Sequence, residues 1–235
     1  MGDFEKYLKL AKKKYPGYRF SWEILTDLIL ENVARRPCWL DIGAGPNLLI
    51  KEQPGADFAV GLDIEKPQEI STNSKESAYC IASADILPFK NKSFDFITSR
   101  YTFEHLESPE KALYEIGRVL KHGGIFVLQT TNTRNPFVFL SRLIPFRLKK
   151  ILFRRLFRDN PSGTFKTRYK INKPSSIEPN YGPLVLKKLI LVEDILCQSR
   201  FFYVVSLGLY KIIKAFGLES MKGNMIAVFS RADDC

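Results

Sequence analysis

Apolar residues in the first half of the chain form two kinds of pattern. Residues 3–14 and 22–34 carry apolar residues at helical spacing, and those of the second helix, which include Trp22, are expected to pack in the core. Ser21 is the expected N-cap of that helix. A further helix is expected from about Ser108 to Leu120. Short apolar runs bounded by turn residues predict buried strands at residues 38–42, 57–62, 79–82, 93–99 and 125–130. This alternation of strands and helices indicates an α/β fold with a parallel, doubly wound sheet.

The same alternation stops after residue 131 and resumes near residue 184. A strand is expected at residues 184–192, a helix at 201–216 and a last strand at 223–230. We therefore treat residues 1–235 as one domain with an insertion, which suits a chain of this length. Its expected parts are N-terminal helices (1–36), a cofactor-binding core (37–131), a basic amphipathic insertion or lid (132–183) and C-terminal elements that complete the sheet (184–235).

Polar residues stand at the carboxyl ends of several predicted strands. Asp41 ends the first strand and is followed at once by a glycine-rich turn, whereas Asp63 ends the second strand and Asp85 follows the third. Arg100 and Tyr101 leave the fourth. Ligands of doubly wound sheets bind beyond the carboxyl ends of the strands, and a carboxylate one strand after a glycine-rich turn suits a ribose. The pattern therefore predicts a nucleoside site at this edge of the sheet.

A series of short motifs also runs in a fixed order through the core. The motifs are Leu40-Asp41-Ile42-Gly43-Ala44-Gly45, Gly61-Leu62-Asp63, Ala84-Asp85-Ile86-Leu87-Pro88-Phe89, Ser93-Phe94-Asp95-Phe96-Ile97, Phe103-Glu104-His105-Leu106 and Glu115-Ile116-Gly117-Arg118-Val119-Leu120-Lys121-His122-Gly123-Gly124. With them, residues 22–131 resemble the class I S-adenosylmethionine-dependent methyltransferases, in particular the small type 11 group. The resemblance implies a Rossmann-like, seven-stranded sheet that is mostly parallel, with an antiparallel last strand between the fifth and sixth strands. It also implies S-adenosyl-L-methionine as the cofactor.

The resemblance further implies which residues bind that cofactor. They are Asp41, Gly43, Ala44, Gly45, Asp63, Ile64, Asp85, Ile86, Arg100 and Tyr101. The glycine-rich turn would pack against the methionine and ribose parts, with Asp41 holding the turn. Asp63 would accept hydrogen bonds from both ribose hydroxyls, and Asp85 would accept one from the adenine amino group. Arg100 and Tyr101 would close over the methionine end.

One position departs from the family pattern. Asn47 stands where many members carry a third glycine, at the start of a crossover helix expected near residues 48–51. Asparagine tolerates the left-handed backbone better than most residues, so the turn can still form. A dinucleotide enzyme is disfavoured, because its pyrophosphate approaches the helix through that third glycine.

The expected chemistry is an in-line methyl transfer, for which the protein mainly positions the acceptor and excludes water. A hydroxyl acceptor would need a base, and His105 is the best-placed candidate, with Tyr101 and Glu104 as alternatives. A structural histidine that caps the loop is the competing interpretation of His105. A carbon nucleophile would need less help. The four cysteines are scattered without metal-binding spacing, so no metal site is expected.

The net charge of +11 is concentrated between Arg134 and Lys170, and Asp159 is the only acidic residue in that segment of the sequence. Residues 137–158 predict a basic amphipathic helix, and residues 164–172 are a candidate substrate loop. The helix could be a lid that packs on the domain, or it could rest on an anionic membrane surface. A nucleic-acid groove is a third interpretation, but phenylalanine and leucine suit acyl chains better than base stacking, so binding of nucleic acid is disfavoured.

These observations favour a methyltransferase that acts on a small-molecule acceptor, either lipophilic or presented by a membrane. The alternatives are an RNA or protein acceptor bound through the basic segment, and a non-catalytic cofactor-binding protein of the same fold. The N-terminus carries acids and no apolar stretch of a signal peptide, and the cysteines suit a reducing compartment. We therefore expect a cytoplasmic protein, in one interpretation peripheral at the inner face of a membrane. The pattern predicts no oligomeric state.

Overall fold

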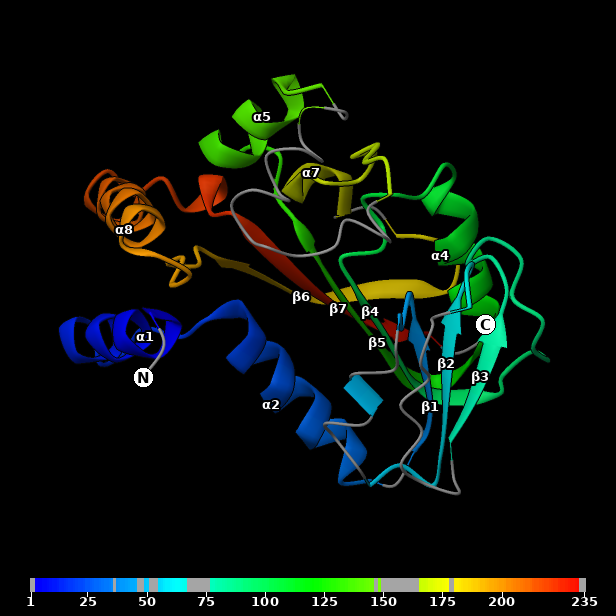
Figure 1. Cartoon of the computed structure of the whole chain (residues 1–235). Coiled ribbons are helices and arrows are strands. Elements are labelled where there is room, and N and C mark those ends of the chain that lie inside the picture. The colour runs from blue at the N-terminus through cyan, green and yellow to red at the C-terminus, as the bar shows by residue number, and fades with distance from the viewer. Residues whose placement is uncertain are drawn as a thin grey trace.

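The computed structural model describes residues 3–35, 37–45, 49–50, 55–66, 77–145, 148, 165–177 and 180–232. Its centre is a seven-stranded sheet flanked by helices (Figure 1). The strands are β1 (Cys38–Ile42), β2 (Phe58–Asp63), β3 (Ser77–Ile81), β4 (Phe94–Arg100), β5 (Leu120–Thr131), β6 (Leu184–Val192) and β7 (Asn224–Arg231). The helices are α1 (Asp3–Lys14), α2 (Ser21–Val33), α4 (Pro109–Val119), α5 (Pro136–Leu143), α7 (Pro174–Ile177), α8 (Arg200–Ala215) and the 3-10 turn η1 (Glu219–Met221).

The strand order is β3-β2-β1-β4-β5-β7-β6. Strands β1 to β5 pair in parallel, whereas β7 lies antiparallel to both β5 and β6. The expected Rossmann-like sheet, mostly parallel with an antiparallel last strand, is therefore confirmed. The strand order reverses between β1 and β4, since chain progression runs outward to β3 on one side and to β5 on the other. In doubly wound sheets this reversal is the place where ligands bind.

Two apolar clusters hold helices on opposite faces of the sheet. On one face α2 packs through Leu25 and Ile29 against Trp39 and Phe96. On the other face α4 packs through Leu113 and its neighbours in the larger cluster. Both faces of the central strands are thus covered, which explains why these strands read as continuous apolar runs.

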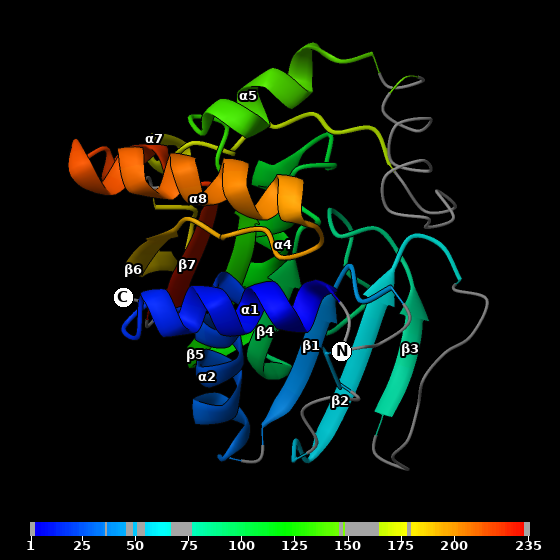
Figure 2. The same ribbon diagram turned by 60° about the vertical axis from the view of Figure 1, so that its left-hand side comes forward.

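A third cluster joins the two ends of the chain. Helices α1 and α8 lie side by side beyond the antiparallel end of the sheet (Figure 2). The rings of Tyr7 and Tyr203 stack with their centroids 4.9 Å apart. Tyr18 also lies in this cluster, and its hydroxyl donates to the carbonyl of Glu193 at 2.7 Å. The N-terminal helices are therefore anchored on the segment that follows β6.

Three local expectations were wrong. Ser21 is the first residue of α2 and does not cap it, because its hydroxyl donates to Asp194 instead. The Phe20 N–H is bound by the side chain of Glu23 at 2.8 Å. Trp22, expected in the core, keeps 47% of its surface exposed. Strand β5 begins at Leu120, directly after α4, where parallel pairing with Phe94 takes over from the helix.

Some expectations fall on residues that the structure does not describe. Asn47 and most of the crossover helix near residues 48–51 lie outside the described ranges, although Leu49 and Ile50 are helical and buried. Of the basic helix expected at residues 137–158, the described part is α5, which Asn135 caps by accepting from the Phe137 N–H at 2.9 Å. Among the described residues, no helix has the length and apolarity to cross a membrane.

Candidate cofactor site

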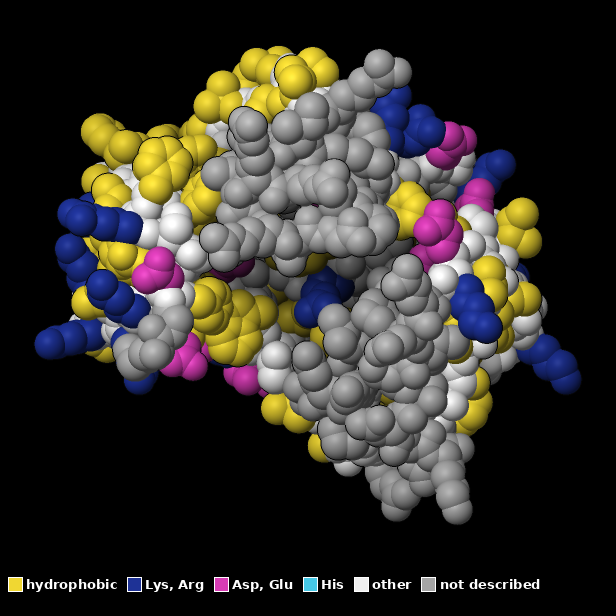
Figure 3. Space-filling model, in the orientation of Figure 1, with side chains coloured by type: hydrophobic (Ala, Val, Ile, Leu, Met, Phe, Trp, Pro, Cys, Tyr) yellow, Lys and Arg dark blue, Asp and Glu magenta, His cyan; other side chains and the backbone are white. Residues whose placement is uncertain are grey.

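A cavity of about 1110 Å³ lies beyond the carboxyl ends of β1, β2 and β4. Two walls enclose it. One wall is built from the strand ends at residues 42, 43, 45, 62–66 and 100–102, and the other from residues 105–107, 165, 166 and 168. Figure 3 shows a hollow near the middle of this face, where basic side chains lie among hydrophobic ones. The cavity coincides with the reversal of strand order, as the fold predicts.

The glycine-rich turn forms the floor of the first wall. Gly43 and Gly45 have φ values of +73° and +51°, in the left-handed region that favours glycine. A Cβ on Gly43 would stand 1.8 Å from Oγ1 and 2.7 Å from Cβ of Thr102, so no side chain fits there. The Gly43 N–H donates to the carbonyl of Leu62 at 2.7 Å. The turn thus exposes bare backbone to the cavity, and Ala44 within it is buried and does not line the cavity.

Asp63 ties the turn to the end of β2. Its Oδ2 accepts from the Gly45 N–H at 3.0 Å, and its Oδ1 accepts from the N–H groups of Ile64 at 2.7 Å and Glu65 at 3.4 Å. An ionised carboxylate has about four lone-pair sites, so about one remains for a ligand, on Oδ2. Asp63 and Ile64 both line the cavity. Tyr79 of β3 supports the arrangement by donating its hydroxyl proton to the Gly45 carbonyl at 2.8 Å.

Asp41 lies behind the turn and outside the cavity. Only 2% of its surface is exposed, and its Oδ1 accepts from the Thr98 hydroxyl at 2.6 Å. That hydroxyl in turn accepts from the Trp39 indole N–H at 2.8 Å. Burial raises the pKa of Asp41 to about 7, with the Thr98 hydrogen bond opposing the shift. Asp41 therefore joins β1 to β4, whereas the turn itself is held by Asp63.

The adenine positions expected at Asp85 and Ile86 lie beside the cavity and not in its wall. The Asp85 carboxylate accepts from the Ser83 hydroxyl, and the Ile86 N–H donates to the Ser83 carbonyl at 3.2 Å. The Ile86 side chain is 74% exposed. Ala82 and Ala84 of the same loop do line the cavity, so the loop reaches it through small side chains.

Arg100 and Tyr101 both line the cavity at the end of β4. Tyr101 has a φ of +53°, a left-handed conformation that is uncommon for an aromatic residue. Its hydroxyl donates to Asn224 Oδ1 at 2.9 Å and accepts from Gln129 Nε2 at 3.0 Å. Burial raises the pKa of Tyr101, and the nearby charge of Asp194 adds to the shift. The hydroxyl is thus engaged in the sheet and poorly suited to act as a base.

His105 and Glu104 point to different surroundings. His105 lines the cavity, and its Nδ1 lies 3.3 Å from the Lys166 carbonyl. A carbonyl can only accept, so Nδ1 is the donor in this contact, and in the neutral ring Nε2 is then the acceptor atom. Glu104 is 7% exposed and accepts from the Thr130 hydroxyl at 2.7 Å. Burial raises the pKa of Glu104. Because Glu104 is buried whereas His105 lines the cavity, His105 is the one of the two that a ligand could contact.

The second wall of the cavity comes from the candidate substrate loop. The Glu104 carbonyl accepts from the N–H groups of Arg168 at 2.6 Å and of Tyr169 at 3.1 Å. The Arg168 guanidinium pairs with Glu107. Backbone contacts thus place Phe165, Lys166 and Arg168 in the cavity wall opposite the glycine-rich turn.

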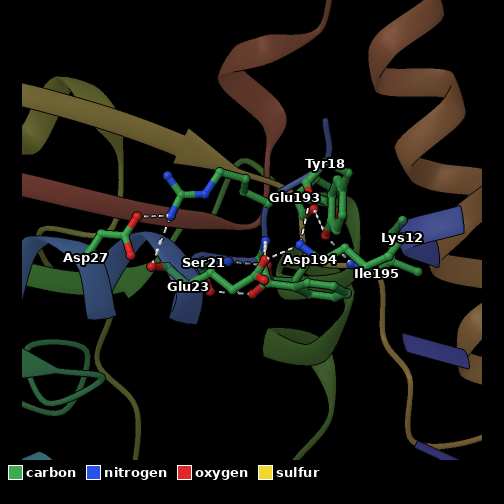
Figure 4. A network of polar contacts seen from close by, with 10 residues as sticks. Lys12, Tyr18, Ser21, Glu23, Asp27, Glu193, Asp194 and Ile195 are labelled. Atoms are coloured by element: carbon green, nitrogen blue, oxygen red, sulfur yellow. Dashed lines mark hydrogen bonds and ion pairs between the residues drawn. The ribbon is translucent and has the colours of Figure 1, made fainter. Parts of the chain in front are cut away.

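A polar network that the sequence pattern did not predict joins Ser21 at the start of α2 to Glu193 and Asp194 (Figure 4). Asp194, which follows β6, accepts from the Ser21 N–H at 2.8 Å and from Asn224 Nδ2 at 3.0 Å. Gln129 joins the network by donating to the Ser21 hydroxyl at 3.0 Å. The sequence did contain a signal, because the acids at residues 193 and 194 directly follow an apolar strand.

Glu193 occupies the neighbouring position in this network. It is 4% exposed, and its Oε2 accepts from the Gly223 N–H at 2.6 Å and from Asn135 Nδ2 at 2.8 Å. Burial raises the pKa of Glu193 to about 7. The two acids therefore fasten the starts of α2 and α5 and the turn before β7 to the end of β6, which fixes the frame behind the cavity.

The fold and this geometry define a class of protein. A parallel sheet with a cavity at its reversal point, a glycine-rich turn and a carboxylate at the end of β2 is the arrangement of α/β proteins that bind a nucleoside cofactor. The available acceptor site of Asp63 matches a ribose hydroxyl, which is a hydrogen-bond donor.

Comparison with known proteins finds a methyltransferase domain in the core of the chain. The family model described as a methyltransferase domain matches residues 40–128. The crystal structure of an S-adenosylmethionine-dependent methyltransferase from Mesorhizobium loti has the same fold, with a TM-score of 0.55 and 15% identity, covering 87% of this chain and 95% of that one. Residues 40–128 are therefore similar to a methyltransferase domain, and the fold of the chain is one that such methyltransferases have.

Two relatives of known sequence are more similar still. An uncharacterized protein of Methanocaldococcus jannaschii is 32% identical over 154 residues, which are 64% of this chain and 60% of that protein. A demethylmenaquinone methyltransferase of Thermus thermophilus is 36% identical over 110 residues, which are 43% of this chain and 50% of that enzyme. The chain therefore spans about half to three fifths of the length of these relatives.

Proposed function

We propose that this protein transfers a methyl group from S-adenosyl-L-methionine to a small, lipophilic acceptor. The observation that carries the proposal is the two-walled cavity. One wall offers bare backbone and the Asp63 carboxylate, and the facing wall offers Leu106, Phe165 and His105. The polar wall suits a nucleoside, whereas the facing wall suits an apolar molecule with a group that can be deprotonated.

The residues of the first wall would bind and orient the cofactor. Gly45 leaves room for it, because no atom lies within 4 Å of where its Cβ would stand, and Asp63 would accept a hydrogen bond from its ribose while still holding the turn. When bound, the cofactor supplies a methyl group on a sulfonium centre. The roles of Asp85 and Ile86 at the adenine end stay a prediction, supported by their position on the loop that lines the cavity through Ala84.

The facing wall would position the acceptor and exclude water. His105 Nε2 is the free acceptor atom of that ring when Nδ1 donates to the Lys166 carbonyl, so it would take the proton of a hydroxyl acceptor. Leu106 and Phe165 would contact an apolar ring. Lys166 adds positive charge, which would stabilise an acceptor oxygen as it loses its proton, whereas the charge of Arg168 is balanced by Glu107.

The relative from Thermus thermophilus supports a quinone-like acceptor, since it is a demethylmenaquinone methyltransferase. Such an acceptor resides in lipid, so the protein would be cytoplasmic and peripheral at the inner face of a membrane. Residues 137–158 were the predicted contact with anionic lipid. That prediction rests only on α5 among the described elements, since most of the segment lies outside the described residues.

Calorimetric titration with S-adenosyl-L-methionine tests the cofactor site. Asp63→Ala should bind the cofactor severely more weakly than the wild type, because it removes both the ribose acceptor and the bond to the Gly45 N–H. Asp27→Ala is the matched control, since Asp27 lies in a surface ion pair with Arg19 far from the cavity. Unaltered binding by Asp63→Ala would refute the site assignment.

Transfer of a labelled methyl group tests the acceptor class. The wild type should label a reduced naphthoquinone that bears a free ring position and a prenyl tail. His105→Ala should lose much of the rate on a hydroxyl acceptor, by about 10²–10⁴-fold. Labelling of RNA or of a protein, with none of the quinol, would replace this proposal by the alternative acceptor. Absence of cofactor binding in the wild type would leave a non-catalytic protein of the same fold.

A further inference from the structure

Helix α8 is apolar on two sides. Its inner side packs Tyr203 and Leu207 into the cluster shared with α1, and Ile213 is buried as well. Its outer side exposes a second apolar stripe, which the inner packing does not require. The exposed members are Phe201 (69%), Val204 (58%), Val205 (38%), Ile212 (51%) and Phe216 (74%). At about 100° per residue these positions, together with Gly208 and Ala215, fall on one side of the helix.

Helix α5 extends this apolar surface. None of its residues is buried, and Phe139, Leu140 and Leu143 are 52%, 56% and 67% exposed. Figures 1 and 2 place α5 and α8 at the same end of the molecule, and hydrophobic side chains gather over both in Figure 3. Asn135, which caps α5, donates to the Met221 carbonyl of η1 at 3.1 Å and so fixes α5 beside the end of α8. We call the exposed apolar residues of α5 and α8 the α5–α8 surface.

The charged residues of α5 and α8 themselves are all basic. Arg200, Lys211 and Lys214 lie on α8, Arg142 lies on α5, and Arg134 precedes α5. Glu219 of η1 follows α8 and pairs with Lys222. Residues 132–145 and 200–218 contain no aspartate or glutamate. On α8, Arg200 and Lys211 border the exposed apolar stripe along one side. An apolar stripe beside bases and without acids is the pattern of helices that rest in the interface of an anionic bilayer.

The α5–α8 surface adjoins the acceptor wall of the cavity. The Arg142 guanidinium of α5 lies 5.5 Å from the ring centroid of Tyr169. The next residue back, Arg168, lines the cavity. A molecule held in lipid against this surface would therefore meet the rim of the cavity without crossing bulk water.

We propose that the α5–α8 surface docks the protein on an anionic membrane, with the apolar side chains entering the headgroup region and the flanking bases facing the lipid charges. This inference deepens the proposed function, because it supplies the route by which a lipophilic acceptor reaches the cavity. A second copy of the chain fits the surface less well. A two-fold contact would bring each basic helix against its own copy, and like charges would repel.

Vesicle flotation tests the docking directly. Wild-type protein should float with vesicles of phosphatidylcholine and phosphatidylglycerol and remain unbound with phosphatidylcholine alone. Phe201→Ser with Phe216→Ser should weaken the partition by about tenfold or more, because both rings are exposed and leave the core intact. Arg200→Gln with Lys211→Gln should weaken it by about fivefold for each charge removed.

The matched control is Lys111→Gln with Tyr114→Ser on α4, which removes one exposed base and one exposed aromatic ring from a different helix. Its partition should equal that of the wild type. Wild-type protein that stays unbound with the anionic vesicles would overturn the proposal, as would an equal loss in the control. A dimer that Phe201→Ser with Phe216→Ser dissociates would assign the surface to a second copy and overturn it too.

Cofactor binding separates this inference from the proposed function. All three double variants should bind S-adenosyl-L-methionine with wild-type affinity, because the exchanged residues lie outside the cavity wall. Normal cofactor binding with no flotation of the wild type would refute the docking alone. Normal flotation with no methyl transfer to any lipophilic acceptor would refute the proposed function and leave the docking standing.

Discussion

Gly43 offers the sharpest test of how the glycine-rich turn packs against the segment that follows β4. A Cβ at this position would stand 1.8 Å from Thr102 Oγ1 and 2.7 Å from both Thr102 Cβ and Cγ2. Rotation of the threonine side chain cannot relieve this, because its Cβ is attached directly to the backbone. In Gly43→Ala, the turn or the segment after β4 must therefore move.

Two effects add to the cost of Gly43→Ala. The φ of +73° is left-handed, which costs a residue with a Cβ roughly 1–2 kcal/mol. The overlap with Thr102 adds about 1–3 kcal/mol, as is typical of overpacking. Gly45→Ala separates the two effects, since Gly45 has a φ of +51° but no atom within 4 Å of its added Cβ. It should show the backbone cost alone.

Urea unfolding and calorimetric titration measure the two consequences. Gly43→Ala should lose roughly 2–5 kcal/mol of unfolding free energy and should bind S-adenosyl-L-methionine more weakly than Gly45→Ala. Thr102→Gly in the Gly43→Ala background removes all three close contacts and should restore part of both losses, which a double-mutant cycle would quantify. Equal losses of unfolding free energy and of cofactor affinity in Gly43→Ala and Gly45→Ala would refute the reasoning. A coupling energy of zero between residues 43 and 102 would refute it too.

Three further predictions concern the frame behind the cavity and the acceptor wall. Because burial raises the pKa of Asp41 to about 7, the folded state binds more protons than the unfolded state between about pH 4 and 7, so stability falls as the pH rises through this window. In Asp41→Asn, the fall of the unfolding free energy between pH 4 and 7 should shrink by up to about 4 kcal/mol. Urea unfolding at a series of pH values measures this fall, and a fall as large as in the wild type would contradict the assignment. Asn135→Ala should cost roughly 2–4 kcal/mol, because it removes the cap of α5 and a partner of the buried Glu193 carboxyl; thermal unfolding measures this, and a loss below about 0.5 kcal/mol would argue against it. His105→Gln should lower the rate of methyl transfer but not the affinity for the cofactor, and an equal loss of both would make the histidine structural.

The order and type of the elements followed from local pattern. Apolar spacing of two kinds distinguishes strands from helices, and turn residues separate them, so β1, β2, β4 and β6 appear within about a residue or two of their expected bounds. The strand-end positions of Gly43, Asp63 and Arg100 also followed, because parallel strands bring their carboxyl ends to one edge. These features depend on neighbours along the chain, which the sequence contains.

The direction in which each side chain points was decided by contacts between distant segments. Asp41 points away from the cavity because it accepts a hydrogen bond from the Thr98 hydroxyl of the adjacent strand. The Tyr101 hydroxyl faces β7 because it donates a hydrogen bond to Asn224. The Ser21 hydroxyl donates a hydrogen bond to Asp194 and does not cap its own helix. From the sequence, a residue at a strand end can be assigned to an edge of the sheet. Its hydrogen-bond partner cannot be assigned in this way, and that partner determines where the polar atoms of the side chain lie.

The sequence by itself determined a Rossmann-like sheet and predicted a cofactor site at the ends of β1, β2 and β4, where the structure has a cavity. Only the tertiary structure decided which residues reach the cavity, that the loop near residues 165–168 forms its second wall, and that Glu193 and Asp194 fasten the frame behind it. Only the tertiary structure showed that α8 is left with an exposed apolar stripe after its inner side is packed. Helical spacing reports that a residue lies on a face, whereas burial depends on what another part of the chain places against that face.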